Sequence, residues 1–169
     1  MEGSSKMKSI KIFAVCVILF LLERVFFTRF QIFSLTPWLL FSFCAVSAAV
    51  HEELGWWTLC AGLCGLAGDL AGGGAAGVGM AVYALGAAGI NIFATRIFHE
   101  RLPFTVAIIF IFSTAAEMLY FLLNSGGMRA VGWRGAFLTV ALPLAVINTV
   151  FALIMYPLAA RLFRERRRI

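Results

Sequence analysis

The chain has 169 residues, of which 62% are hydrophobic and only 13% are charged. Soluble domains carry about 25% charged residues, so this composition excludes an ordinary soluble domain and predicts a helical membrane protein. The net charge of +6 comes largely from basic clusters at the two ends of the chain. Such clusters are typical of the flanks of membrane spans and of contacts with anionic lipid, and they do not indicate nucleic-acid binding.

Apolar runs long enough to cross a bilayer fill almost the whole chain. The six predicted spans cover residues 9–27, 37–50, 54–70, 78–97, 103–123 and 137–162. The breaks between them contain proline, glycine or charged residues, and the longest predicted loop covers 124–135. The predicted fold class is therefore an all-α integral membrane protein with six transmembrane helices in a single membrane domain.

Basic residues predict the orientation of these spans. An even number of spans places both termini on one side of the membrane. With both termini in the cytoplasm, ten of the lysines and arginines lie inside and four lie outside, which obeys the positive-inside rule. The predicted location is the bacterial cytoplasmic (inner) membrane, with multiple passes and both termini cytoplasmic.

Asp69 is the most informative residue, because a carboxylate deep in an apolar span is costly unless it is paired or lies near water. It follows Gly65 and Gly68 and precedes the glycine cluster 72–74. Two interpretations stay open for Asp69: a carboxylate that caps or orders the glycine turn, and a contact with a ligand or partner. Glu23, near the end of the first span, is most simply explained by an interfacial position.

Glu117 is a second deep carboxylate, and it shares one helix face with other polar residues. The spacings of four, three and four that define this face connect Ser113, Glu117, Tyr120 and Asn124. This polar stripe either faces a cavity, partner or ligand, or is satisfied by neighbouring helices within the bundle.

Small and polar residues at helical spacing are typical of packed membrane helices. In the fourth span Ala84 and Ala88 form such a small-residue pair, and Asn91 lies close by. In the sixth span Asn148 lies on one stripe with three alanines and a tyrosine: Ala141, Ala145, Ala152 and Tyr156. Both faces are candidates for partner docking or for packing inside the bundle.

Two prolines of the sixth span are expected to bend it. Pro143 and Pro157 each remove a backbone hydrogen bond from the helix. Pro157 has a second interpretation, as the point where the helix leaves the membrane.

Motifs that carry chemistry are missing from the sequence. It contains no metalloprotease helix, phosphate-binding loop or nucleophile elbow. The four cysteines lie in apolar runs and are interpreted as packing residues, because neither histidine is placed to complete a metal set with them. We therefore expect no enzyme activity, no cofactor and no metal site.

In four features the chain resembles MreD, the rod shape-determining membrane protein of bacteria. They are the GxxGDLxxGGxxG-type segment from Gly65 through Gly77, the Gly/Ala-rich span with its exit at 91–96, the stretch 117–124, and the closing Leu142-Pro143, Asn148 and Tyr156-Pro157-Leu158 with a basic tail. Length and span count are also similar, so the resemblance covers essentially the whole chain. The first two spans match in hydropathy alone.

The resemblance implies a function and a set of partners. MreD-like proteins are non-enzymatic scaffolds of the machinery that inserts peptidoglycan along the side wall of rod-shaped cells. The implied partner is MreC, a single-span protein with a periplasmic domain, and the wider complex contains MreB, RodA and a transpeptidase. The family is similar in fold to the six-helix substrate-binding subunits of energy-coupling-factor transporters. A small-molecule-binding subunit of a transporter is therefore the alternative function.

Overall fold

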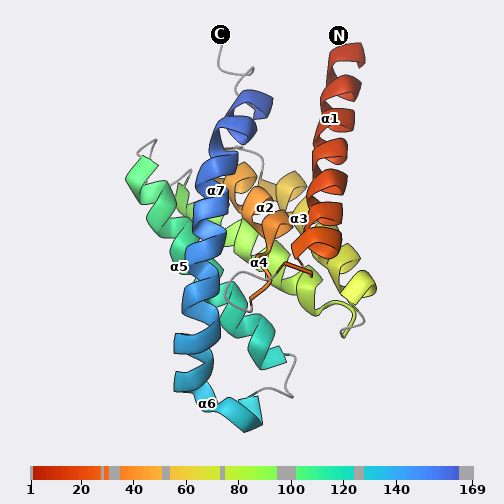
Figure 1. Cartoon of the computed structure of the whole chain (residues 1–169). Helices are drawn as coiled ribbons and strands as arrows, with labels where there is room; N and C mark the ends of the chain where they lie inside the picture. The colour runs from red at the N-terminus through yellow and green to blue at the C-terminus, as the bar shows by residue number, and fades with distance from the viewer. Residues whose placement is uncertain are drawn as a thin grey trace.

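A computed structural model of the chain describes residues 2–27, 29–30, 35–50, 54–72, 75–94, 102–123 and 128–163, and these residues are almost entirely helical (Figure 1). The helical segments in chain order are α1 (Glu2–Leu21), η1 (Leu22–Phe27), α2 (Leu39–Val50), α3 (Leu54–Gly72), α4 (Val78–Ile92), α5 (Leu102–Leu123), α6 (Met128–Ala136), η3 (Phe137–Ala141) and α7 (Leu142–Phe163). The segments η1 and η3 are π-helical.

Three helical stretches of the described residues are long and apolar enough to cross a membrane: Leu54–Gly72, Pro103–Leu123 and Gly132–Leu162. They contain the third, fifth and sixth predicted spans. The class predicted from composition, a helical membrane protein, agrees with this finding.

The other predicted spans have different forms. The second span forms α2, which has only 12 residues, or about 18 Å of helix against a hydrocarbon core about 30 Å thick. The fourth span forms α4, with 15 residues, and its predicted end at 95–97 lies outside the described residues. The helix that contains the first predicted span begins earlier than that span, since α1 starts at Glu2 and includes Lys6 and Lys8, and it continues into the π-helical η1.

The predicted loop 124–135 is wrong from residue 128 onward, and its residues 124–127 lie outside the described residues. Residues 128–136 form α6, which is kinked at Gly132. Pro143 is the second residue of α7, and α7 directly follows η3. Because a proline has no N–H to donate, an irregular turn just before it is expected. Pro157 lies inside α7, which continues beyond it to Phe163.

The short helix α2 lies at the centre of the bundle. Its residues 39–48 are all buried, as expected for a helix that is apolar on every side. It packs mainly against α7, α4 and α3. By contrast, α1 and η1 lie on the outside, and Leu19 and Glu23 are the only buried side chains among those described in these two segments.

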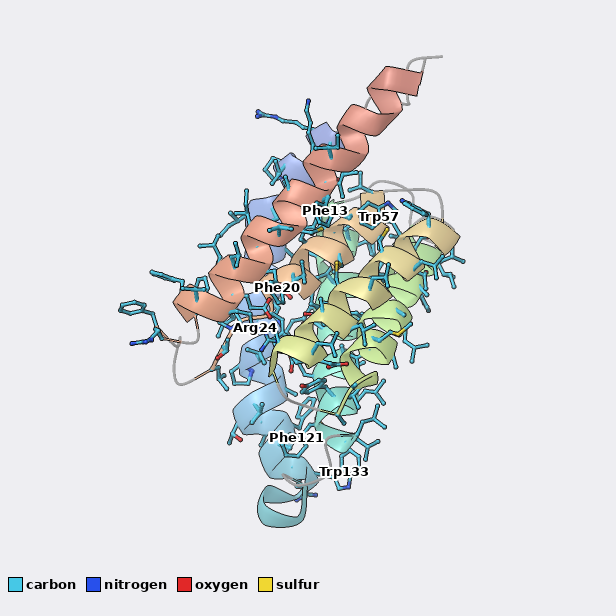
Figure 2. All side chains as sticks on the ribbon, turned by 90° about the vertical axis from the view of Figure 1, so that its right-hand side faces the viewer. Phe13, Phe20, Arg24, Trp57, Phe121 and Trp133 are labelled. Atoms are coloured by element: carbon cyan, nitrogen blue, oxygen red, sulfur yellow. The ribbon has the colours of Figure 1, made fainter. Side chains whose placement is uncertain are left out.

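The start of α1 and the end of α7 lie at the same end of the bundle. Figure 1 shows the start of α1 and the end of α7 together at the top, with α6 at the opposite end. Figure 2 shows α1 crossing the outside of the bundle, with Arg24 at its lower end and Trp133 near the bottom of the molecule.

Candidate functional site

The strongest candidate site is a buried polar network around the start of α2. The helix is preceded by the buried, non-helical Pro37 and by Trp38. The first N–H groups of any helix lack partners within the helix, and here side chains of other segments supply them. The Trp38 N–H donates to Asn148 Oδ1 of α7 at 2.9 Å, and the Leu40 N–H donates to Glu23 Oε2 of η1 at 3.0 Å.

Asn148 connects this helix start to the polar stripe of α5. Its amide nitrogen donates to Glu117 Oε1 at 3.1 Å and lies 3.3 Å from Ser113 Oγ. Ser113 and Glu117 are 0% and 5% exposed, so the predicted stripe faces the bundle interior at these two positions. One amide therefore joins α2, α5 and α7. Asn124, the last member of the predicted stripe, lies outside the described residues.

Aromatic rings pack beside the network. The Trp38 ring lies 6.0 Å from the Tyr83 ring in a stacked arrangement and 4.9 Å from the Tyr120 ring in an edge-on one. The Phe41 ring completes the group at 5.2 Å from Tyr83. These rings pack around Trp38, which lies in the non-helical segment directly before α2.

The other end of α2 is also held by a side chain. Asn91 of α4, which is 3% exposed, donates from Nδ2 to the Ala48 carbonyl at 2.8 Å. The last four carbonyls of a helix lack partners within it, and Ala48 is one of these. Asn91 and Asn148, both singled out from the sequence, thus act at opposite ends of the same short helix.

Asp69 serves the start of α4 in the same way. Its carboxylate accepts from the Gly77 N–H at 2.9 Å, from the Gly79 N–H at 3.0 and 2.8 Å, and from the Met80 N–H at 3.4 Å. Gly77 has φ 100°, a left-handed conformation that favours glycine. Of the two interpretations of Asp69, this arrangement is the capping one, and both carboxylate oxygens are occupied by backbone groups.

The two glycines before Asp69, Gly65 and Gly68, allow different close contacts of α3. A Cβ on Gly65 would lie 2.5 Å from the Gly79 carbonyl carbon, so α3 and α4 touch backbone to backbone there. A Cβ on Gly68 would meet only the Arg24 guanidinium, at 3.3 Å. Arg24 donates to the Gly68 carbonyl at 2.6 Å, which places a cation near the C-terminus of α3, where the helix dipole favours it.

The small-residue faces considered for partner docking lie largely within the bundle. Ala84 is half-buried and packs near Gly62 of α3, where an added Cβ would lie 3.5 Å from Ala84 Cβ. Ala88 is half-buried as well. The stripe of the sixth predicted span, which runs from η3 into α7, faces inward. Tyr156 is half-buried, and the other four members are at most 2% exposed: Ala141, Ala145, Asn148 and Ala152.

Sequence reasoning missed Glu23 and Arg24 as members of this polar framework. An interfacial position was expected, whereas Glu23 is 6% exposed and caps α2. Asp69 and Glu117 were singled out because an ionisable side chain in an apolar run is costly unless it has a partner. The same argument applies to Glu23.

The polar side chains of this network bond to helix ends and to one another across helices. The two deep carboxylates share no hydrogen-bond partner. Asp69 accepts from backbone N–H groups, and Glu117 accepts from the side-chain amide of Asn148. Within the described ranges, no group of three His, Cys, Asp or Glu side chains is arranged to hold a metal ion.

Comparison with protein-family models, with curated proteins and with solved structures finds no match to this chain. The class that the fold and the polar network define is a helical membrane protein with a short, buried central helix.

Proposed function

We propose that this chain is a non-enzymatic membrane scaffold of the MreD type, which binds an MreC-like single-span protein. In this role it helps to position peptidoglycan synthesis during the elongation of a rod-shaped cell, alongside MreB, RodA and a transpeptidase. The observation that supports the proposal is the use of the buried polar groups. Asp69, Asn91, Glu117 and Asn148 each bond to a helix end or to another helix, as expected of a framework that presents an apolar surface.

The proposed topology has six spans in the bacterial inner membrane, with both termini cytoplasmic. The shared location of the start of α1 and the end of α7 supports it (Figure 1), because an even number of crossings requires this. The short α2 fits a crossing in which its non-helical entry lies at membrane depth. Irregular backbone is tolerated there only when it is buried in protein, and here Pro37 is buried and Trp38 is half-buried.

The environment of Asp69 does not favour the alternative function, a small-molecule-binding subunit of a transporter. A ligand at the outer side would need this carboxylate, yet both its oxygens accept backbone hydrogen bonds and the residue is 4% exposed. A ligand would have to displace the start of α4 to reach it.

The partner's helix is proposed to dock on exposed side chains, since the small-residue faces lie largely inside. One exposed stripe on α7 contains Val146, Val150 and Ile154, which are 46%, 50% and 64% exposed. Their spacing of four places them on one face.

The experiment is co-purification of the tagged chain from its native host in mild detergent, followed by mass spectrometry. The proposal predicts recovery of a single-span protein with a periplasmic coiled coil, together with wall synthases. A tagged membrane protein of similar size from the same host serves as the control. Recovery of ATP-binding subunits with a bound vitamin would instead support the transporter alternative.

A further inference from the structure

The last helical stretch of the chain is longer than a bilayer crossing requires. The apolar stretch Gly132–Leu162 has 31 residues, which corresponds to about 46 Å of helix, whereas the hydrocarbon core is about 30 Å thick. Membrane helices tilt by up to about 40°, and even that tilt leaves about 35 Å along the membrane normal. At least one end of the stretch therefore lies beyond the hydrocarbon.

Two exposed arginines mark the ends of this stretch. Arg134 lies near its start and Arg161 near its end, and both side chains are exposed. None of the residues between them is charged. Arg161 follows Arg134 by 27 positions, or about 40 Å of helix, which matches the thickness of about 40–45 Å of a bilayer with its headgroup layers. The two guanidinium groups can thus lie in the headgroup layers of opposite leaflets.

The start of the stretch has the side chains of a membrane interface. Trp133 is 55% exposed and directly precedes Arg134, and Phe137 and Leu138 follow with 38% and 61% exposed. Tryptophan is enriched at the level of the headgroups, and the planar guanidinium of arginine binds phosphate oxygens. The order of an aromatic, a cationic and then apolar side chains follows the passage from headgroups into hydrocarbon.

The helix α6 lies apart from the first four helices of the bundle. It packs mainly against η3 and α5. Its kink at Gly132, with φ 70° and ψ 163°, turns the chain into the long stretch in a conformation that favours glycine. Figure 2 shows Trp133 farther than Arg24 from the start of α1. The exposed side chains of this end therefore face the surroundings of the protein.

We propose that α6 and the start of η3 lie in the headgroup layer of the leaflet opposite the start of α1, where Arg134 binds the phosphate of an anionic phospholipid such as phosphatidylglycerol. The guanidinium N–H groups donate to the phosphate oxygens. Trp133 lies at the level of the headgroups, and Phe137 and Leu138 contact the upper part of the acyl chains. This lipid site depends on no protein partner.

The same position sets the depth of the buried polar network. Because Arg24 lies between the start of α1 and Trp133 along the bundle (Figure 2), it and the adjacent Glu23 lie deeper in the bilayer than α6. Water does not satisfy backbone groups in the hydrocarbon region. This depth gives a reason why the Leu40 N–H is paired with the Glu23 carboxylate.

The first test measures depth with the full-length chain in vesicles of phosphatidylcholine and phosphatidylglycerol. Lipids carry a spin label either on the headgroup or near the end of the acyl chain. The fluorescence lost in Trp133→Phe is the Trp133 signal, and we expect the headgroup label to quench it at least about threefold more than the chain label. Trp133→Phe combined with Val146→Trp is the matched control, because Val146 is 46% exposed and lies about 20 Å further along the helix. Its added signal should show the reverse order.

The second test measures lipid affinity by native mass spectrometry of the chain titrated with phosphatidylglycerol. Arg134→Gln should weaken the binding of one lipid by about fivefold, and Arg134→Lys, which keeps the charge without the planar fork, should weaken it by less. Thr139→Ala removes an exposed polar group close by and should leave the affinity unchanged. Strongest quenching of Trp133 by the chain label, no quenching by either label, or equal affinities of wild type and Arg134→Gln would each overturn the proposal.

Discussion

Replacing Gly65 with alanine should separate α3 from α4 and destabilise the protein. The added Cβ would lie 2.5 Å from the Gly79 carbonyl carbon and 2.9 Å from the Met80 nitrogen. Neither is a flexible side chain, so the two backbones themselves must move. Since contacts below 3.4 Å are already tight, the helices have to separate by about 1 Å.

The magnitude follows from two effects that act together. Overpacking of a well-packed interior costs about 1–3 kcal/mol. The same movement stretches the hydrogen bonds from Gly77 and Gly79 to Asp69, and each bond to a charged group contributes about 1.5–3 kcal/mol. Alanine returns about 1 kcal/mol through its better helix propensity. We therefore expect Gly65→Ala to lower the free energy of unfolding by about 3 kcal/mol.

The assay is equilibrium unfolding in mixed micelles with increasing SDS, followed by circular dichroism. Gly55→Ala is the matched control, because it lies on the same helix and its added Cβ would meet nothing within 4 Å. That variant should unfold at the wild-type SDS fraction or slightly above it. If Gly65→Ala and Gly55→Ala unfold together, the close contact between α3 and α4 does not exist in the folded protein.

Three further predictions concern the polar network and the small-residue face. Asp69→Ala should lower the free energy of unfolding by about 2–4 kcal/mol, because it leaves several N–H groups without their acceptor. Asp69→Asn keeps one acceptor oxygen and should lower it by less. An equal loss in both variants would contradict the capping role. Asn148→Leu should lower stability by about 2–3 kcal/mol in the same assay and increase hydrogen exchange at Trp38, whereas unchanged exchange there would refute the bond to α2. Ala84→Leu should lower stability by about 1–3 kcal/mol, and wild-type stability would show that Ala84 faces lipid.

The helical class and most helix positions were predictable because they depend on local features of the chain. Runs of apolar residues set the extent of α3, α5 and α7, and the structure places these close to the predicted bounds. The bounds of α2 are also close to those predicted for the second span. What the sequence did not predict is the contact at its start, because Asn148, which accepts from the Trp38 N–H, lies 110 residues away.

The sequence predicted which polar residues matter for the fold, but not which groups each of them contacts. Asp69, Asn91, Glu117 and Asn148 were identified because polar groups in apolar spans need an explanation. Which helix end each of them serves depends on how the helices meet, and the sequence does not contain that information in any local pattern. Glu23 was missed for a related reason: its position near the end of a span offered a cheaper explanation than the one the fold adopts.

The polar network gives a physical reason why so short a helix persists at the centre of a membrane bundle. Each unsatisfied backbone group in the hydrocarbon region costs several kcal/mol, and α2 would expose such groups at both ends. Glu23 accepts from the Leu40 N–H in its first turn, Asn148 accepts from the Trp38 N–H just before it, and Asn91 donates to the Ala48 carbonyl in its last turn. Hydrogen bonds between the buried polar side chains and the unpaired backbone groups at the ends of α2 thus offset the desolvation cost of both. Either set of groups would be costly without the other. The polar residues and the short α2 therefore depend on each other. If α2 were lengthened to a full span, the Leu40 N–H would bond within the helix, and the Glu23 carboxylate would stay buried without this hydrogen-bond donor.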